Sequence, residues 1–135
     1  MTHEEADAEG NPLPIYAVRL TAAVVEQTTT AFFWINDKPG IDAADAWQSG
    51  LDAVWASLAT LPYRCQVAEE NRIFQRKHPG PPLRVFLYWH GRNAWQILLT
   101  IHEAEGGDQP YVKLHQLRSS AQKPLTKWPE DSPTI

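Results

Sequence analysis

The sequence contains one cysteine among 135 residues, so it cannot form an internal disulfide. A lone cysteine, here Cys65, is typical of a protein in the reducing cytoplasm. No apolar run approaches the roughly 20 residues that a helix needs to cross a bilayer, and the first residues are acidic where a secretion signal would be basic. We therefore predict a soluble cytoplasmic protein with no membrane partner.

The sequence also lacks the short motifs that mark common catalytic sites. It has no glycine-rich phosphate loop, no nucleophile elbow and no internal repeat. Three of its histidines, His90, His102 and His115, fall on separate predicted strands, without the close spacing of metal ligands. We expect neither a metal site nor a cofactor.

The net charge of −4 is unevenly distributed along the chain. Residues 14–63 include two basic and five acidic residues, whereas residues 64–128 include ten basic and five acidic ones. The basic half points to an anionic or acidic partner. A solvated surface without a partner explains the same charges equally well.

Three apolar runs in the second half of the chain predict an antiparallel meander. They span residues 83–90, 94–102 and 111–118, and turn-forming residues separate them. Because side chains alternate between the faces of a strand, the middle run presents one apolar face, made of Trp95, Ile97, Leu99 and Ile101. The first run is expected to present an apolar face made of Leu83, Val85, Leu87 and Trp89.

The first half predicts one short strand and two helices. Residues 15–20 form the strand, and Thr21 is a suitable N-cap for a helix that runs to about Asn36. Asp42 is the expected N-cap of a second helix that Pro62 ends. The apolar residues of this helix recur at helical spacing: Ala44, Trp47, Leu51, Val54, Leu58 and Leu61. The order β-α-α-β-β-β predicts an α+β domain in which a helical hairpin packs on a small antiparallel sheet.

Three further segments lack this periodicity. Residues 1–13 are polar and acidic, which predicts a disordered leader. Residues 63–82 are interpreted as a connector ending in a Pro/Gly run, and residues 126–135 as a mobile tail. The single ordered domain is expected to span residues 14–125.

Four polar residues on the three predicted strands are candidates for one binding patch: Arg84, Gln96, His115 and Arg118. Side chains from neighbouring strands can converge, and such a patch would bind a phosphate or the carboxylates of a partner. Aromatic residues interleave with them and would allow base stacking, unless they belong to the core: Tyr88, Trp89, Trp95 and Tyr111.

The ordered set of segments resembles the RelE/ParE toxins of bacterial type II toxin–antitoxin systems. The resemblance covers residues 16–125. The segments are similar, in turn, to the family's opening strand, second helix, Leu-Pro connector and three sheet strands: 16–21, 43–61, 61–69, 83–88, 94–101 and 114–121. The resemblance implies a toxin that a tightly bound antitoxin neutralises. The antitoxin is expected to contact the helical hairpin and the exposed edge of the meander, through Trp55, Tyr88 and Tyr111.

The family is divided by target. RelE-like members are metal-independent endoribonucleases that cut messenger RNA on the ribosome, and a nuclease of this sequence would use Arg84, His115 and Arg118. ParE-like members inhibit DNA gyrase without catalysis. This sequence departs from the nuclease pattern, because Gln96 and Ser119 stand where the family usually has arginine and histidine. Neither residue supplies the charge or the titrating group that RNA cleavage requires.

We therefore predict a ParE-like toxin that binds a protein target, with DNA gyrase as the candidate implied by the resemblance. The residues expected to contact the target or a phosphate are Arg84, Gln96, Arg118 and Ser119. Two alternatives stay open. One is a RelE-like nuclease in which His115 or Tyr111 replaces the missing groups, and the other is a non-toxic member that still binds antitoxin.

Overall fold

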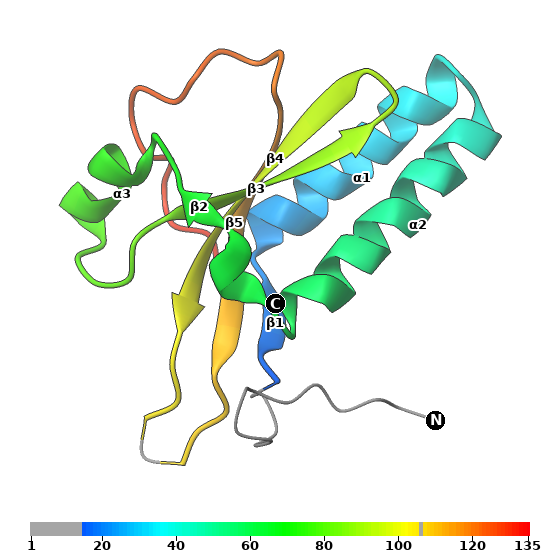
Figure 1. Ribbon diagram of the computed structural model, residues 1–135. Coiled ribbons are helices and arrows are strands. Elements are labelled where there is room, and N and C mark those ends of the chain that lie inside the picture. The colour runs from blue at the N-terminus through cyan, green and yellow to red at the C-terminus, as the bar shows by residue number, and fades with distance from the viewer. Residues whose placement is uncertain (1–14, 106) are drawn as a thin grey trace, which may run out of the picture.

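The computed structural model describes residues 15–105 and 107–135 (Figure 1). The expected leader, residues 1–13, lies outside the described residues. The elements in chain order are β1 (Ala17–Leu20), α1 (Ala22–Asp37), α2 (Ile41–Leu58), the 3-10 helix η1 (Pro62–Arg64), β2 (Gln66–Val67), α3 (Asn71–Lys77), β3 (Arg84–His90), β4 (Asn93–His102) and β5 (Tyr111–Ser119). The α+β class is confirmed. None of the described helices has both the length and the apolar character needed to span a membrane.

The sheet has five strands in the order β1-β5-β4-β3-β2. The meander is confirmed, because β3, β4 and β5 pair antiparallel in sequence. The expectation of an antiparallel sheet is wrong at one edge, where β1 pairs parallel to β5 from Ala17↔Tyr111 to Leu20↔Leu114. A parallel pair needs a long connection between its strands. The helices and the meander supply that connection, and the sheet is mixed.

The helical hairpin covers one face of the sheet (Figure 1). Thr21 is the N-cap of α1, as predicted, and its hydroxyl accepts a hydrogen bond from the Val24 amide at 3.4 Å. The second helix begins at Ile41, two residues earlier than expected, because Gly40, with a φ of 112°, takes the N-cap position instead of Asp42. Its predicted apolar stripe is buried from Ala44 to Leu58. The helix ends there, and Leu61 is exposed.

The expected apolar face of β3 is wrong. Directly paired residues on neighbouring strands share a face, and Phe86 and Tyr88 pair with Ile97 and Trp95 of β4, which belong to the main core. Phe86 and Tyr88 therefore point toward the helices, while Leu87 and Trp89 are exposed on the opposite, outer face. The alternation of apolar and polar residues does not identify the core face of β3, because this strand carries large apolar residues on both of its faces.

The connector is more ordered than expected, since η1, β2 and α3 all lie within residues 63–82 or at their border. The helix α3 brings Phe74 onto the outer face of the sheet, where it joins a second, smaller core. The buried members of this core are Ala68, Phe74, Leu83, Leu98 and Trp128. Where the second core lies, both faces of the sheet are thus covered. The helical hairpin covers one face, and α3 and the end of the chain cover the other.

The C-terminal segment, residues 126–135, contacts the domain at several points. Trp128 is 4% exposed, in the second core. The segment also closes the first turn of α1, because the amide of Ala22 donates to the Pro133 carbonyl at 2.8 Å and that of Ala23 to the Ser132 hydroxyl at 2.8 Å. Its mobility stays a prediction, but these contacts fix where it lies.

A close approach between α2 and β3 yields a test of the packing. A side chain at Gly50 would overlap the hydroxyl of Tyr88, which is buried and donates to the Trp47 carbonyl at 2.8 Å. Gly50→Ala should therefore lower the free energy of unfolding by on the order of 3 kcal/mol, through overpacking and the disturbed hydrogen bond. Chemical denaturation monitored by tryptophan fluorescence measures this change.

Two variants control this prediction. Ser49→Ala, on the exposed side of the same helix, should change stability by no more than about 0.5 kcal/mol. In a Tyr88→Phe background the same glycine substitution should cost less, because the overlapping oxygen is gone. Equal costs in both backgrounds would contradict this packing.

Candidate functional site

A groove lies between α1 and the C-terminal part of β5, which follows Leu114. β1 pairs with β5 only as far as Leu114, and within the described residues no strand continues the sheet beyond that point. The groove has a volume of about 580 Å³. Its lining combines an apolar floor with polar rims and is formed by Ala23, Glu26, Gln27, Thr30, Ala31, Trp34, Trp95, Leu117, Arg118, Ser119 and Gln122. A free strand edge beside an apolar groove can accept an extended segment of another protein.

Glutamine side chains satisfy this free edge of β5. The amide of Leu117 donates to Gln27 Oε1 at 2.7 Å, and the amide of Ser119 donates to Gln122 Oε1 at 2.8 Å. The Gln27 amide group also donates to Gln116 Oε1 at 2.6 Å. A carboxamide has the same donor and acceptor groups as a peptide unit. The two glutamines therefore hold the positions that the backbone of an added strand would take.

Two of the predicted target-binding residues, Arg118 and Ser119, lie along this groove. The guanidinium of Arg118 donates to the carbonyl of Lys123 at 2.6 Å, and the hydroxyl of Ser119 accepts from the amide of Ala121 at 3.3 Å. Both residues hold the turn that follows β5. Their polar groups are within reach of a segment bound at the strand edge.

The other two predicted residues do not line the groove, although Gln96 is the direct neighbour of Arg118 on the adjacent strand. Arg84 pairs with Leu99 and therefore stands on the face that carries the helices, where its guanidinium donates to the Cys65 carbonyl at 2.7 Å. Gln96 pairs with Arg118 on the opposite face. Leu99 and Gln96 are three positions apart on β4, about 10 Å along the strand. The structure does not bring Arg84 together with Gln96 and Arg118 in one patch.

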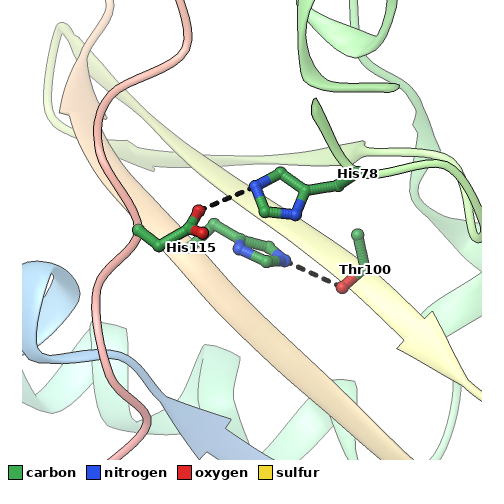
Figure 2. A network of polar contacts seen from close by, with 4 residues as sticks. His78, Thr100 and His115 are labelled. Atoms are coloured by element: carbon green, nitrogen blue, oxygen red, sulfur yellow. Dashed lines mark hydrogen bonds and ion pairs between the residues drawn. The ribbon is translucent and has the colours of Figure 1, made fainter. Parts of the chain in front are cut away.

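His115 lies on the outer face, in contact with the second core (Figure 2). Its Nε2 is 2.8 Å from the hydroxyl of Thr100, which is also 2.7 Å from Nε2 of His102. A hydroxyl has one proton, so it donates to one of these rings and accepts from the other. Burial, reinforced by Lys113 and neighbouring histidines, lowers the pKa of His115 to about 3. The ring is neutral at physiological pH.

The three residues expected at the antitoxin surface are dispersed. Trp55 is half-buried at the margin of the main core, and Tyr88 is only 8% exposed, so the side chain of Tyr88 has no surface to offer. Tyr111 lies at the far end of β5, where its ring stacks on His102 at 4.4 Å and beneath the guanidinium of Arg19 at 3.9 Å. Tyr88 is buried and therefore does not belong to an exposed contact surface.

Several residues of the site had no signal in the sequence. Gln27 looks like an ordinary helix-surface residue, and only the shortness of β1 gives it a strand edge to cap. The hydroxyls of Tyr16 and Tyr63 both donate to the carboxylate of Glu103, and no pattern in the sequence indicates these contacts. Burial and this carboxylate raise the pKa of Tyr16 to about 12. His78 and Trp128 were read as parts of a connector and a tail.

Among the described residues, no three His, Cys, Asp or Glu side chains are arranged to hold a metal ion. The thiol of Cys65 is buried, and burial raises its pKa, which disfavours the reactive thiolate. Comparison of the chain with protein-family models, with curated proteins and with solved structures finds no match.

The lowered pKa of His115 predicts how stability depends on pH. Its pKa is about 3 in the folded protein and about 6.5 in the unfolded chain, so below pH 6.5 only the unfolded chain takes up this proton. The free energy of unfolding should fall as the pH decreases from about 6.5 toward 3, by up to about 1.4 kcal/mol per pH unit from this group. His102, whose pKa burial also lowers, adds to the same trend.

Urea unfolding of the wild type and of His115→Gln at a series of pH values from 7 to 4 measures this contribution. The slope of stability against pH should be smaller in the variant by up to one bound proton, whatever the absolute stability of the variant. Identical slopes in the two proteins would show that His115 takes up its proton equally well in the folded state.

Proposed function

We propose that this chain is the ParE-like toxin subunit of a type II toxin–antitoxin pair, which acts by binding a protein target and is neutralised by its antitoxin. DNA gyrase is the candidate target. The observation that carries the proposal is the strand edge of β5 beyond Leu114, beside the groove. There the backbone amides of Leu117 and Ser119 donate to glutamine side chains and not to a neighbouring strand. The strand, helical hairpin and three-strand meander that the resemblance implies occur in that order, with β2 and α3 as additional elements, and this order supports the proposal.

The proposed occupant of the groove is an extended segment of the antitoxin. Its backbone would exchange with the carboxamides of Gln27 and Gln122, so hydrogen bonds at the edge are replaced and none is lost. Its apolar side chains would cover Ala31 and Trp34, of which the latter is 55% exposed. The gain in affinity then comes mainly from burial of apolar surface, while the strand edge fixes the register.

The positions of the charged groups favour binding over RNA cleavage. Cleavage by attack of a 2′-hydroxyl needs a base, an acid and cations around one phosphate. Arg84 and Arg118 stand on opposite faces of the sheet, and each guanidinium donates to a backbone carbonyl of its own chain. His115 is half-buried, and this burial lowers its pKa to about 3. These three residues do not surround a common position for a phosphate.

Expression of the chain in a bacterial host tests the toxin proposal. Induction should arrest growth, and coexpression of the short open reading frame adjacent to its gene should restore growth. Purified protein should inhibit supercoiling by DNA gyrase and leave in-vitro translation unaffected. Unchanged growth would remove the toxin proposal, and transcript cleavage with normal supercoiling would replace the gyrase proposal by the nuclease.

A pair of threonines on α1 tests the groove. Thr30 is exposed and lines the groove, whereas its exposed neighbour Thr29 does not and bonds the Val25 carbonyl instead. Thr30→Lys should weaken binding of the product of the adjacent reading frame at least about tenfold, equivalent to ~1.4 kcal/mol, because the lysine occupies the space of the partner.

Thr29→Lys is the matched control, with the same change of charge, size and helix propensity one position away. It should bind within about twofold of the wild type, which is ~0.4 kcal/mol. Calorimetry of the two variants against the same partner gives the comparison. Equal affinities for both variants would place the partner on another surface.

A further inference from the structure

A second cavity lies on the outer face of the sheet, away from the groove. It has a volume of about 290 Å³ and is enclosed by α3, the following loop, β4 and β5. Its polar lining consists of Lys77, His78, Thr100, His102, Lys113 and His115. The remaining walls are aromatic or proline residues, and no carboxylate is among the lining residues.

The positive charge of this cavity is not neutralised from within. Lys77 and Lys113 form no ion pair with any carboxylate in residues 15–105 and 107–135. Lys113 also contributes, after burial, to the lowered pKa of both His102 and His115, whereas Asp131 of the C-terminal segment acts on the pKa of His115 in the opposite direction. An anion in the cavity would relieve this repulsion.

The chain places one of its own carboxylates at the edge of the cavity. Asp131 Oδ1 of the C-terminal segment is 2.8 Å from Nε2 of His78 (Figure 2). An adjoining cavity of about 140 Å³, which shares His78, Lys113 and His115, is lined on its other side by Glu130 and Asp131. The side chain of Asp131 is 77% exposed, so it can leave without unfolding the core. It is an internal substitute for an external anion.

We propose that this cavity binds a compact dianion, either inorganic phosphate or the phosphate group of a small phosphomonoester, between the ammonium groups of Lys77 and Lys113. His78, released from Asp131, donates a third hydrogen bond to the anion. A cavity near the lower end of the ~300–1,000 Å³ range of small-molecule sites accommodates a small ligand and not a polymer. The three groups that face the ligand come from α3, the residue that follows it, and β5, and the ring of Phe74 in α3 lies 5.1 Å from that of His115 in β5.

The charged and titratable groups that face the cavity come from four parts of the chain. The loop and helix of α3 carry Lys77 and His78, β4 carries His102, and β5 carries Lys113 and His115. The C-terminal segment carries the competing Asp131. Because a bound dianion and Asp131 require the same imidazole, removal of the aspartate charge should strengthen binding.

NMR titration of the full-length chain with inorganic phosphate, at constant ionic strength maintained with chloride, tests the proposal. Saturable shifts should appear for Thr100, His102 and His115. Lys77→Gln and Lys113→Gln should each weaken phosphate binding about tenfold, and Asp131→Asn should strengthen it several-fold. Lys123→Gln, an exposed lysine outside the cavity, should bind phosphate as the wild type does.

The same titration with glycerol 3-phosphate distinguishes the sources of the anion. Tighter binding of the ester than of inorganic phosphate would assign the site to a small phosphorylated metabolite, and equal binding would assign it to free phosphate. Shifts that chloride reproduces, or an affinity that Lys77→Gln and Lys113→Gln leave unchanged, would overturn the proposal. Circular dichroism of each variant verifies that its fold is intact.

Discussion

The contact between α2 and the centre of the sheet determines the rest of the structure. Trp47 is fully buried, and its ring lies 5.2 Å from that of Trp95, centroid to centroid. The carbonyl of Trp47 accepts a hydrogen bond from the hydroxyl of Tyr88. This geometry is possible only because Gly50 has no side chain. Trp47 Nε1 has no hydrogen-bond partner among the described residues. An unpartnered donor of this kind costs about 1–3 kcal/mol, so the packing around it outweighs that loss.

This contact sets the faces of all the strands in the meander. With Trp95 and Tyr88 directed at α2, alternation places Leu87, Gln96 and Leu98 on the outer face. An extra residue in β5, opposite the Leu98–Leu99 step, lets Leu114 and Leu117 both face the main core although three positions separate them. His115 follows Leu114 and lies on the outer face by ordinary alternation, and the irregularity places Gln116 on that face as well. A register slip of one residue would reverse each of these assignments.

The sequence predicts best where one physical requirement governs a segment. The stripe from Ala44 to Leu58 was identified because a helix with one buried face must repeat its apolar residues every three or four positions. The face of β3 was misassigned because the chain covers both sides of that strand, so that alternation no longer distinguishes core from surface. The helix α3 has no apolar periodicity that would predict it, because its seven mostly polar residues bury only Phe74.

The candidate groove was less predictable than the fold, for a reason that lies in the pairing of strands. Gln27 caps the edge of β5 because β1 stops four residues into a nine-residue strand, and no local pattern in either segment encodes where that pairing ends. Likewise, the expected cluster of Arg84 with Arg118 depends on the parity of residues across two strands. A single misassigned face, that of β3, was enough to separate them.

The C-terminal segment contacts both the first turn of α1 and the second core. Through Ser132 and Pro133 it satisfies amides in the first turn of α1, which a helix cannot satisfy by itself. Through Trp128 it closes the second core. These contacts hold the segment in place independently of the exposed ion pair between Asp131 and His78, which contributes about 0–1 kcal/mol as such pairs do. Displacement of Asp131 by the proposed anion would therefore leave α1, and with it the wall of the groove, in place.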